Sequence, residues 1–164
     1  MLRNSCVAAV LIAALAASPV SAQCWTGKEV SAARVRDLQT ALMVGALQCR
    51  GSGTEVLPAF NRFVIAARAH IGRQNDLLRA HFAAESGPRE GQVAYDRFTT
   101  SLANGHAQTT GASSYCATMV AYAEQAGEAA AGPDPVAALT ALASELGERP
   151  RGVGDTCKLE IASR

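Results

Sequence analysis

The amino-acid sequence predicts an all-α protein, an up-and-down bundle of about five helices stapled by two disulfides. Apolar residues recur at intervals of three and four along several segments, as they do on the buried face of a helix. Glycine and proline separate these segments, and no segment shows the sustained alternation of a β-strand. Cys6 lies in an N-terminal segment that we expect to be removed on export. The four other cysteines are an even number, which in an exported chain indicates disulfides.

The first 22 residues have the pattern of a secretory signal peptide. Arg3 supplies the positive start, residues 7–17 are apolar, and residues 20–22 form a small-x-small cleavage site. The apolar run is too short to serve as a membrane anchor. We therefore expect cleavage after Ala22, a single mature domain over residues 23–164 with no transmembrane segment, and a periplasmic or secreted location.

The charges of the mature chain balance, with 14 Lys plus Arg against 14 Asp plus Glu once Arg3 is removed from the 15 basic residues. They are unevenly distributed: residues 23–82 hold eight basic and four acidic groups, and residues 83–164 hold six and ten. This indicates a basic helix pair facing acidic segments of the same domain. The alternative is a basic outer face for an anionic lipid, glycan or protein. Export, near-neutral charge and few aromatics argue against nucleic acid as a partner.

The first two predicted helices are the longest. A Thr-x-x-Glu capping box at residues 26–29 starts a helix over about 28–49, whose second half is apolar all round and should lie in the middle of the domain. The second helix begins within 54–58, where proline is tolerated in the first turn, and runs to about residue 84. It is roughly 40 Å long and should span the full height of the bundle.

Three shorter helices follow, each starting close to a serine or proline. The third begins at residue 88, and the weakly helical segment 104–111 should fray into a loop. The fourth begins at about 113 and ends within 129–132, and the fifth covers about 135–146 after an Asp-Pro start. The tail should be irregular except for a short segment at 158–161.

The alternating direction of the helices selects one of the three pairings that four cysteines allow. If Cys24 lies at one end of the bundle, then Cys49 lies at the other end, and the third helix brings Cys116 there too. Cys24 cannot reach Cys49, because about 20 helical residues separate them by roughly 30 Å, against roughly 5.5 Å in a disulfide. The predicted bonds are Cys49–Cys116 and Cys24–Cys157, and the second requires the tail to return along the bundle.

The three histidines are the candidate metal ligands or catalytic bases. His70 and His81 lie on one stripe of the second helix, but eleven residues of helix hold them about 16 Å apart, too far to share an ion. We interpret His81 as a core histidine with Glu85 one turn away, and we expect no metal or cofactor. The alternative is a site that His106 or a carboxylate of another helix completes.

Four arginines on the polar side of the second helix form the candidate binding face: Arg62, Arg68, Arg73 and Arg79. Guanidinium groups in such a row can bind phosphate or carboxylate with paired hydrogen bonds. The alternative is a solvated or salt-bridged face. The Arg-Ala-His triplets at 68–70 and 79–81 repeat after eleven residues, which is similar to amphipathic lipid-binding helices.

Three short motifs of the mature chain resemble small secreted bacterial helical proteins that have no assigned function: Cys24-Trp25-Thr26, the run from Ala33 to Gln39, and Tyr95-Asp96-Arg97-Phe98. The resemblance implies export and a helical fold, and it implies no site. Enzyme signatures such as G-x-S-x-G and the P-loop do not occur in the sequence.

We therefore expect an exported non-enzymatic binding protein of the bacterial envelope, of the accessory-factor or inhibitor type. Its expected partner is a protein or an anionic envelope component. Two alternatives remain open: a small metal-binding or hydrolytic helical bundle that uses the histidines, and a protein that binds anionic lipid.

Overall fold

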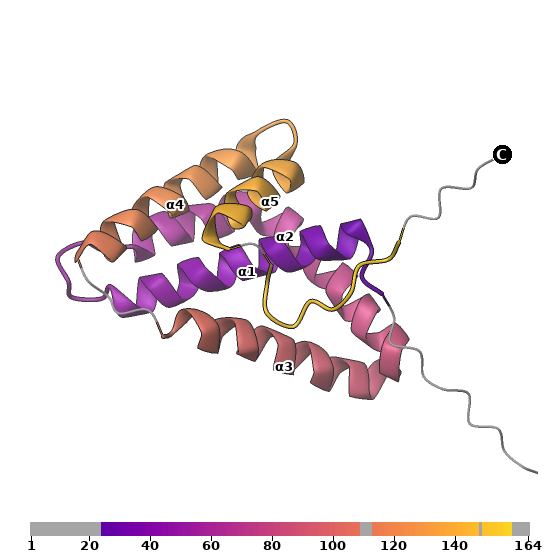
Figure 1. The fold of residues 1–164 in the computed structure, drawn as a ribbon. Helices are drawn as coiled ribbons and strands as arrows, with labels where there is room; N and C mark the ends of the chain where they lie inside the picture. Colours follow the sequence, from indigo (N-terminus) through magenta and orange to yellow (C-terminus); the bar gives the residue numbers. More distant parts are fainter. Residues whose placement is uncertain (1–23, 109–112, 148, 159–164) are drawn as a thin grey trace, which may run out of the picture.

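A computed structural model describes residues 24–108, 113–147 and 149–158; the expected signal peptide and its cleavage site lie outside these residues. The described chain forms five helices: α1 (Gly27–Gln48), α2 (Leu57–Ser86), α3 (Pro88–His106), α4 (Ser113–Ala131) and α5 (Pro135–Leu146). These residues contain no β-strand, and one isolated parallel bridge joins Trp25 to Thr156. The predicted all-α bundle is confirmed (Figure 1).

The two long helices α1 and α2 form the centre of the bundle. Each of them contacts all four of the other helices. Within the described residues, α3 contacts neither α4 nor α5. The α1–α2 pair is therefore covered by α3 on one side and by α4 and α5 on the other (Figure 1).

The apolar interior divides into two clusters that share α1 and α2. The first lies between α1, the N-terminal part of α2, α4 and α5, and it includes the fully buried Phe63. The second lies between the first turns of α1, the C-terminal part of α2 and α3, and it includes Leu78, Phe82 and Trp25. As predicted, α2 runs the length of the bundle, and together with α1, which also contributes to both, it joins the two clusters.

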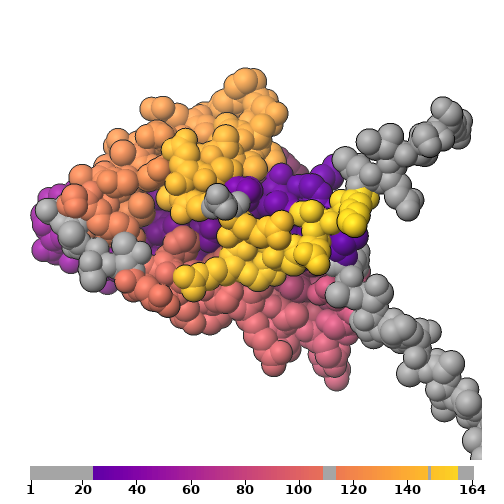
Figure 2. Space-filling view, in the orientation of Figure 1, coloured from indigo at the N-terminus to yellow at the C-terminus, as the bar shows by residue number. Residues whose placement is uncertain are grey.

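Both predicted disulfides are present. Cys49 joins Cys116 with a Cα–Cα distance of 5.7 Å, and Cys24 joins Cys157 with a Cα–Cα distance of 4.9 Å. To make the second bond, residues 149–158 return across the surface between α3 and α5, and we call this segment the C-terminal strap (Figure 2). Two disulfides are typical of proteins outside the reducing cytoplasm. No helix among the described residues has the length and apolar character needed to cross a membrane.

The end of α3 differs from the prediction. The segment 104–111 was expected to fray into a loop, but α3 continues through Asn104 and Gly105 to His106. Tertiary contacts hold this last turn, because the His106 ring bonds to Asp37 of α1 and the Arg151 side chain packs against Gly105. Residues 107–108 form a turn, and residues 109–111 lie outside the described part of the chain. Helix α2 ends at Ser86, two residues beyond its predicted end at 84, whereas α4 ends at Ala131, within the predicted range 129–132. The predicted short segment at 158–161 lies outside the described residues except for its first residue.

Candidate functional site

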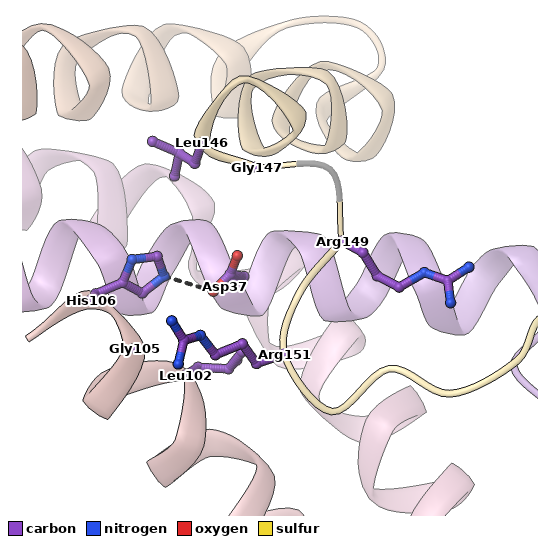
Figure 3. Close-up of a pocket in the computed structure, with 8 residues that line it drawn as sticks. All are labelled: Asp37, Leu102, Gly105, His106, Leu146, Gly147, Arg149 and Arg151. Atoms are coloured by element: carbon purple, nitrogen blue, oxygen red, sulfur yellow. Dashed lines mark hydrogen bonds and ion pairs between the residues drawn. The ribbon is translucent and has the colours of Figure 1, made fainter. Parts of the chain in front are cut away.

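A pocket of about 210 Å³ lies over α1, at the opening between α3 and α5. Helices α3 and α5 do not contact one another in the described chain. The C-terminal strap crosses the opening between them and forms the remaining wall of the pocket, which we call the strap pocket (Figure 3). The lining residues come from four segments of the chain: Asp37, Leu102, Gly105, His106, Leu146, Gly147, Arg149 and Arg151.

An imidazole–carboxylate pair occupies one side of the pocket. His106 Nε2 lies 2.7 Å from Asp37 Oδ1, and the side chains are 25% and 15% exposed. A carboxylate can only accept hydrogen bonds, so Nε2 carries the proton and Nδ1 can accept a bond or, when protonated, donate a second one. The ring lies in the last turn of α3.

The two arginines of the strap, Arg149 and Arg151, point in different directions. The Arg151 guanidinium points toward the His106–Asp37 pair, whereas Arg149 extends away from it and donates from Nη1 to the Gly154 carbonyl at 3.3 Å (Figure 3). A Cβ at Gly105 would lie 2.8 Å from Arg151 Nε, so glycine makes room for the arginine against α3. Within the described residues, the Arg151 guanidinium has no hydrogen-bond partner. Arg151 therefore offers its donors to the pocket.

This arrangement suits the binding of an anion better than covalent catalysis. Arg151 presents a planar fork of donors, and a protonated His106 would add a further donor and a positive charge. Leu102 and Leu146 supply apolar walls. Among the described residues that line the pocket there is no Ser, Thr, Cys or Tyr, so hydrolysis by these residues would require water as the nucleophile.

His81 lies away from this pocket, in the second apolar cluster. Its Nδ1 donates to Glu29 Oε1 at 3.1 Å, and the Trp25 ring lies 4.1 Å away between centroids. The prediction that Glu85 is the partner of His81 was wrong. The carboxylate that bonds to His81 is that of Glu29 in α1, which packs against the buried side of α2, where His81 lies. Its Nε2 is buried and has no partner in the described part of the chain. His81 is thus a core residue, as predicted.

Glu29 is held as a carboxylate by several donors. Burial raises its pKa, but hydrogen bonds from the hydroxyl and backbone N–H of Thr26 and from His81 outweigh burial and leave the pKa below its ordinary value of 4.5. The Thr26 donors lie 2.7 and 2.6 Å from Glu29 Oε2. The predicted capping box therefore also ties the start of α1 to α2 through His81.

Replacing Glu29→Gln should lower the free energy of unfolding by about 1–2 kcal/mol at neutral pH. The folded-state pKa is lower than the unfolded one, so the stabilisation by the carboxylate is present above pH 4.5 and is lost as the pH falls through the folded pKa. Urea unfolding of the wild type and the variant should give free energies that converge on acidification. A gap that stays constant from neutral to acidic pH would contradict this account.

The three histidines do not come together. His70 accepts from Arg73 at 2.8 Å, His81 bonds to Glu29, and His106 bonds to Asp37. Among the described residues, no group of three or more His, Cys, Asp or Glu side chains could hold a metal ion. The three histidines therefore occupy separate environments, and only His106 lines the strap pocket.

All four arginines of the predicted binding face are exposed, but they lie along two edges of α2 about 120° apart. On one edge Arg62 pairs with Glu124 of α4 at 3.4 Å. On the other, Arg79 pairs with Asp76 at 3.3 Å and covers the Tyr95 ring at 5.0 Å. Ile65 is 76% exposed on the surface between the edges. The structure therefore shows a solvated and partly salt-bridged face, and the binding of phosphate or carboxylate by these arginines stays a prediction.

Sequence reasoning missed the part that Asp37, Arg149 and Arg151 play at the pocket. One available signal was the expected return of the tail along the bundle, which carries two arginines past the end of the third helix. Comparison of the chain with models of known protein families, with curated proteins and with solved structures gave no match.

Proposed function

We propose that this is an exported, non-enzymatic binding protein of the bacterial envelope that recognises an anionic group through the strap pocket. One observation carries the proposal: the Arg151 guanidinium, which has no hydrogen-bond partner among the described residues, points toward the His106–Asp37 pair. A carboxylate or phosphate can accept two parallel bonds from such a guanidinium. His106, when protonated, would supply the third donor.

The size of the pocket limits what it can enclose. Its volume of about 210 Å³ is below the 300–1,000 Å³ typical of sites that bury a whole drug-sized ligand. The bound part is therefore an anionic group at the end of a larger partner, either a carboxylate or a phosphate. Asp37 opposes an anion by charge, but its Oδ1 is already bonded to His106 and contributes mainly by orienting that ring.

Replacing Arg151→Gln should weaken anion binding at least about tenfold, because a bidentate charged contact is lost. NMR titrations with inorganic phosphate and with acetate, at low salt and mildly acidic pH, would measure the dissociation constants. The shifts should concentrate at His106 and the strap. Arg68→Gln is the matched control, since Arg68 is exposed on α2 and does not line the pocket. Equal binding by wild type and Arg151→Gln would overturn the proposal.

The same variants separate this site from the outer surface of α2. With vesicles that contain phosphatidylglycerol, binding through the strap pocket should depend on Arg151 and survive Arg68→Gln. The opposite pattern, with a steep loss in salt, would instead assign lipid binding to the arginines around Ile65.

A further inference from the structure

The two disulfides differ in their accessibility. Cys49 and Cys116 are both 0% exposed, inside the first apolar cluster. Cys24 is exposed and Cys157 is half-buried. A thiolate must reach a disulfide sulfur to exchange with it, so a reductant in solution will react with Cys24–Cys157 well before the buried bond.

Few contacts besides this disulfide hold the far end of the strap. Two backbone bonds join it to the start of the chain, from the Trp25 N–H to the Asp155 carbonyl at 2.8 Å and from the Cys157 N–H to the Trp25 carbonyl at 2.9 Å. Only Pro150 and Val153 of residues 149–158 are buried. Such a segment, with little buried apolar surface, belongs to the least stable part of a fold.

We propose that the Cys24–Cys157 disulfide is a redox latch that holds the strap closed over the anion pocket. The proposal rests on the function proposed above, and it adds the regulation of the same site. In the oxidised protein the latch keeps Arg151 against α3 and beside His106. In the reduced protein α5 is the only covalent tether of the strap to the bundle, the two backbone bonds to Trp25 open and close, and Arg151 leaves the pocket.

The reductant is a dithiol, and the exchange balances in two steps. The first thiolate of the dithiol attacks one latch sulfur, forms a mixed disulfide and releases the other latch cysteine as a thiolate, which takes up a proton. The second thiol of the reductant then displaces the remaining latch cysteine. Two electrons and two protons pass to Cys24 and Cys157, and the dithiol becomes a disulfide. Oxidation by a disulfide of the same class closes the latch again.

The effect on binding follows from the population of the closed strap. If reduction leaves the strap closed about one tenth of the time, the apparent dissociation constant rises about tenfold. The first apolar cluster should stay folded throughout, because the Cys49–Cys116 bond inside it is protected.

Limited trypsin digestion reports on the latch without any ligand. Trypsin can cut after Arg151 when the strap is released, whereas Pro150 protects the bond after Arg149 in either redox state. Dithiothreitol is titrated until alkylation and mass spectrometry show Cys24 and Cys157 free and Cys49 and Cys116 still joined.

Cleavage after Arg151 should then be at least about tenfold faster than in the oxidised protein. Cys24→Ser/Cys157→Ser should be cleaved fast with or without dithiothreitol, while cleavage after Arg73, in the middle of α2, should not change. Equal cleavage after Arg151 in oxidised and selectively reduced protein would overturn the latch.

Phosphate titration of the same samples tests the link to the pocket. The selectively reduced wild type and Cys24→Ser/Cys157→Ser should bind inorganic phosphate about tenfold more weakly than the oxidised wild type. Faster cleavage with unchanged phosphate affinity would overturn the control of binding by the strap. If the oxidised wild type fails to bind phosphate or acetate, it is the proposed function that fails, and digestion alone then decides whether the strap is released.

Discussion

Removal of the Cys49–Cys116 disulfide, by replacing both residues with alanine, should lower the free energy of unfolding by about 4 kcal/mol. The bond closes a loop between residues that are 67 positions apart in the sequence. Without the bond, the unfolded chain regains the conformational entropy that closing this loop removes. The loss is large against the roughly 5–15 kcal/mol that stabilises an ordinary domain. Urea unfolding followed by circular dichroism would measure it in protein whose other disulfide is intact.

Cys24→Ala/Cys157→Ala is the matched comparison. With the inner bond in place, the outer bond closes a further loop of similar length, since its separation of 133 exceeds 67 by 66. The folded strap, however, has few buried residues and can come free, so this cross-link restrains the folded and unfolded states alike. We therefore expect a clearly smaller loss for the outer pair. Equal losses would show that the strap is an integral part of the folded core.

Gly91→Ala should lower the free energy of unfolding by about 3 kcal/mol, although alanine is the better helix former. A Cβ at Gly91 would lie 2.6 Å from the Ala83 Cα and 2.6 Å from the Phe82 carbonyl oxygen. Both are backbone atoms of α2 and cannot move aside as a flexible side chain can. The first turn of α3 must therefore separate from α2, which loosens the second apolar cluster.

Gly72→Ala is the control, because Gly72 is an exposed helical glycine whose added Cβ would meet nothing within 4 Å. It should stabilise the protein by up to about 1 kcal/mol through helix propensity alone. Thermal and urea unfolding should thus show changes of opposite sign for the two glycines. An unchanged or higher stability of Gly91→Ala would refute the close approach of α3 to α2.

Local signals in the sequence were sufficient for most of the fold. The capping box at Thr26 and the prolines at residues 88 and 135 mark helix starts through backbone chemistry that tertiary packing does not alter. The alternating helix directions then determined both disulfides, because a helix of known length separates its ends by a known distance.

The pocket could not be predicted in the same way. Its lining includes Asp37, His106 and Arg151, which lie on three different segments of the chain. No spacing of residues along a single helix could therefore predict that they meet. His106 is helical because of the tertiary contacts at the end of α3, and these do not appear in the local sequence. The partner of His81 was missed for a related reason: Glu85 lies one turn away on the same helix, whereas Glu29 reaches His81 only after α1 packs against α2.

The division of the apolar interior has a consequence for how the domain opens. Each cluster has its own cross-link, Cys49–Cys116 within the first and Cys24–Cys157 at the edge of the second, and α3 makes no contact with α4 or α5 in the described chain. The two clusters can therefore act as separate cooperative folding units that share α1 and α2. The strap pocket takes its lining from both sides of this division, from α3 and from α5. A bound anion would then couple the two units and slow hydrogen exchange in helices that it does not touch.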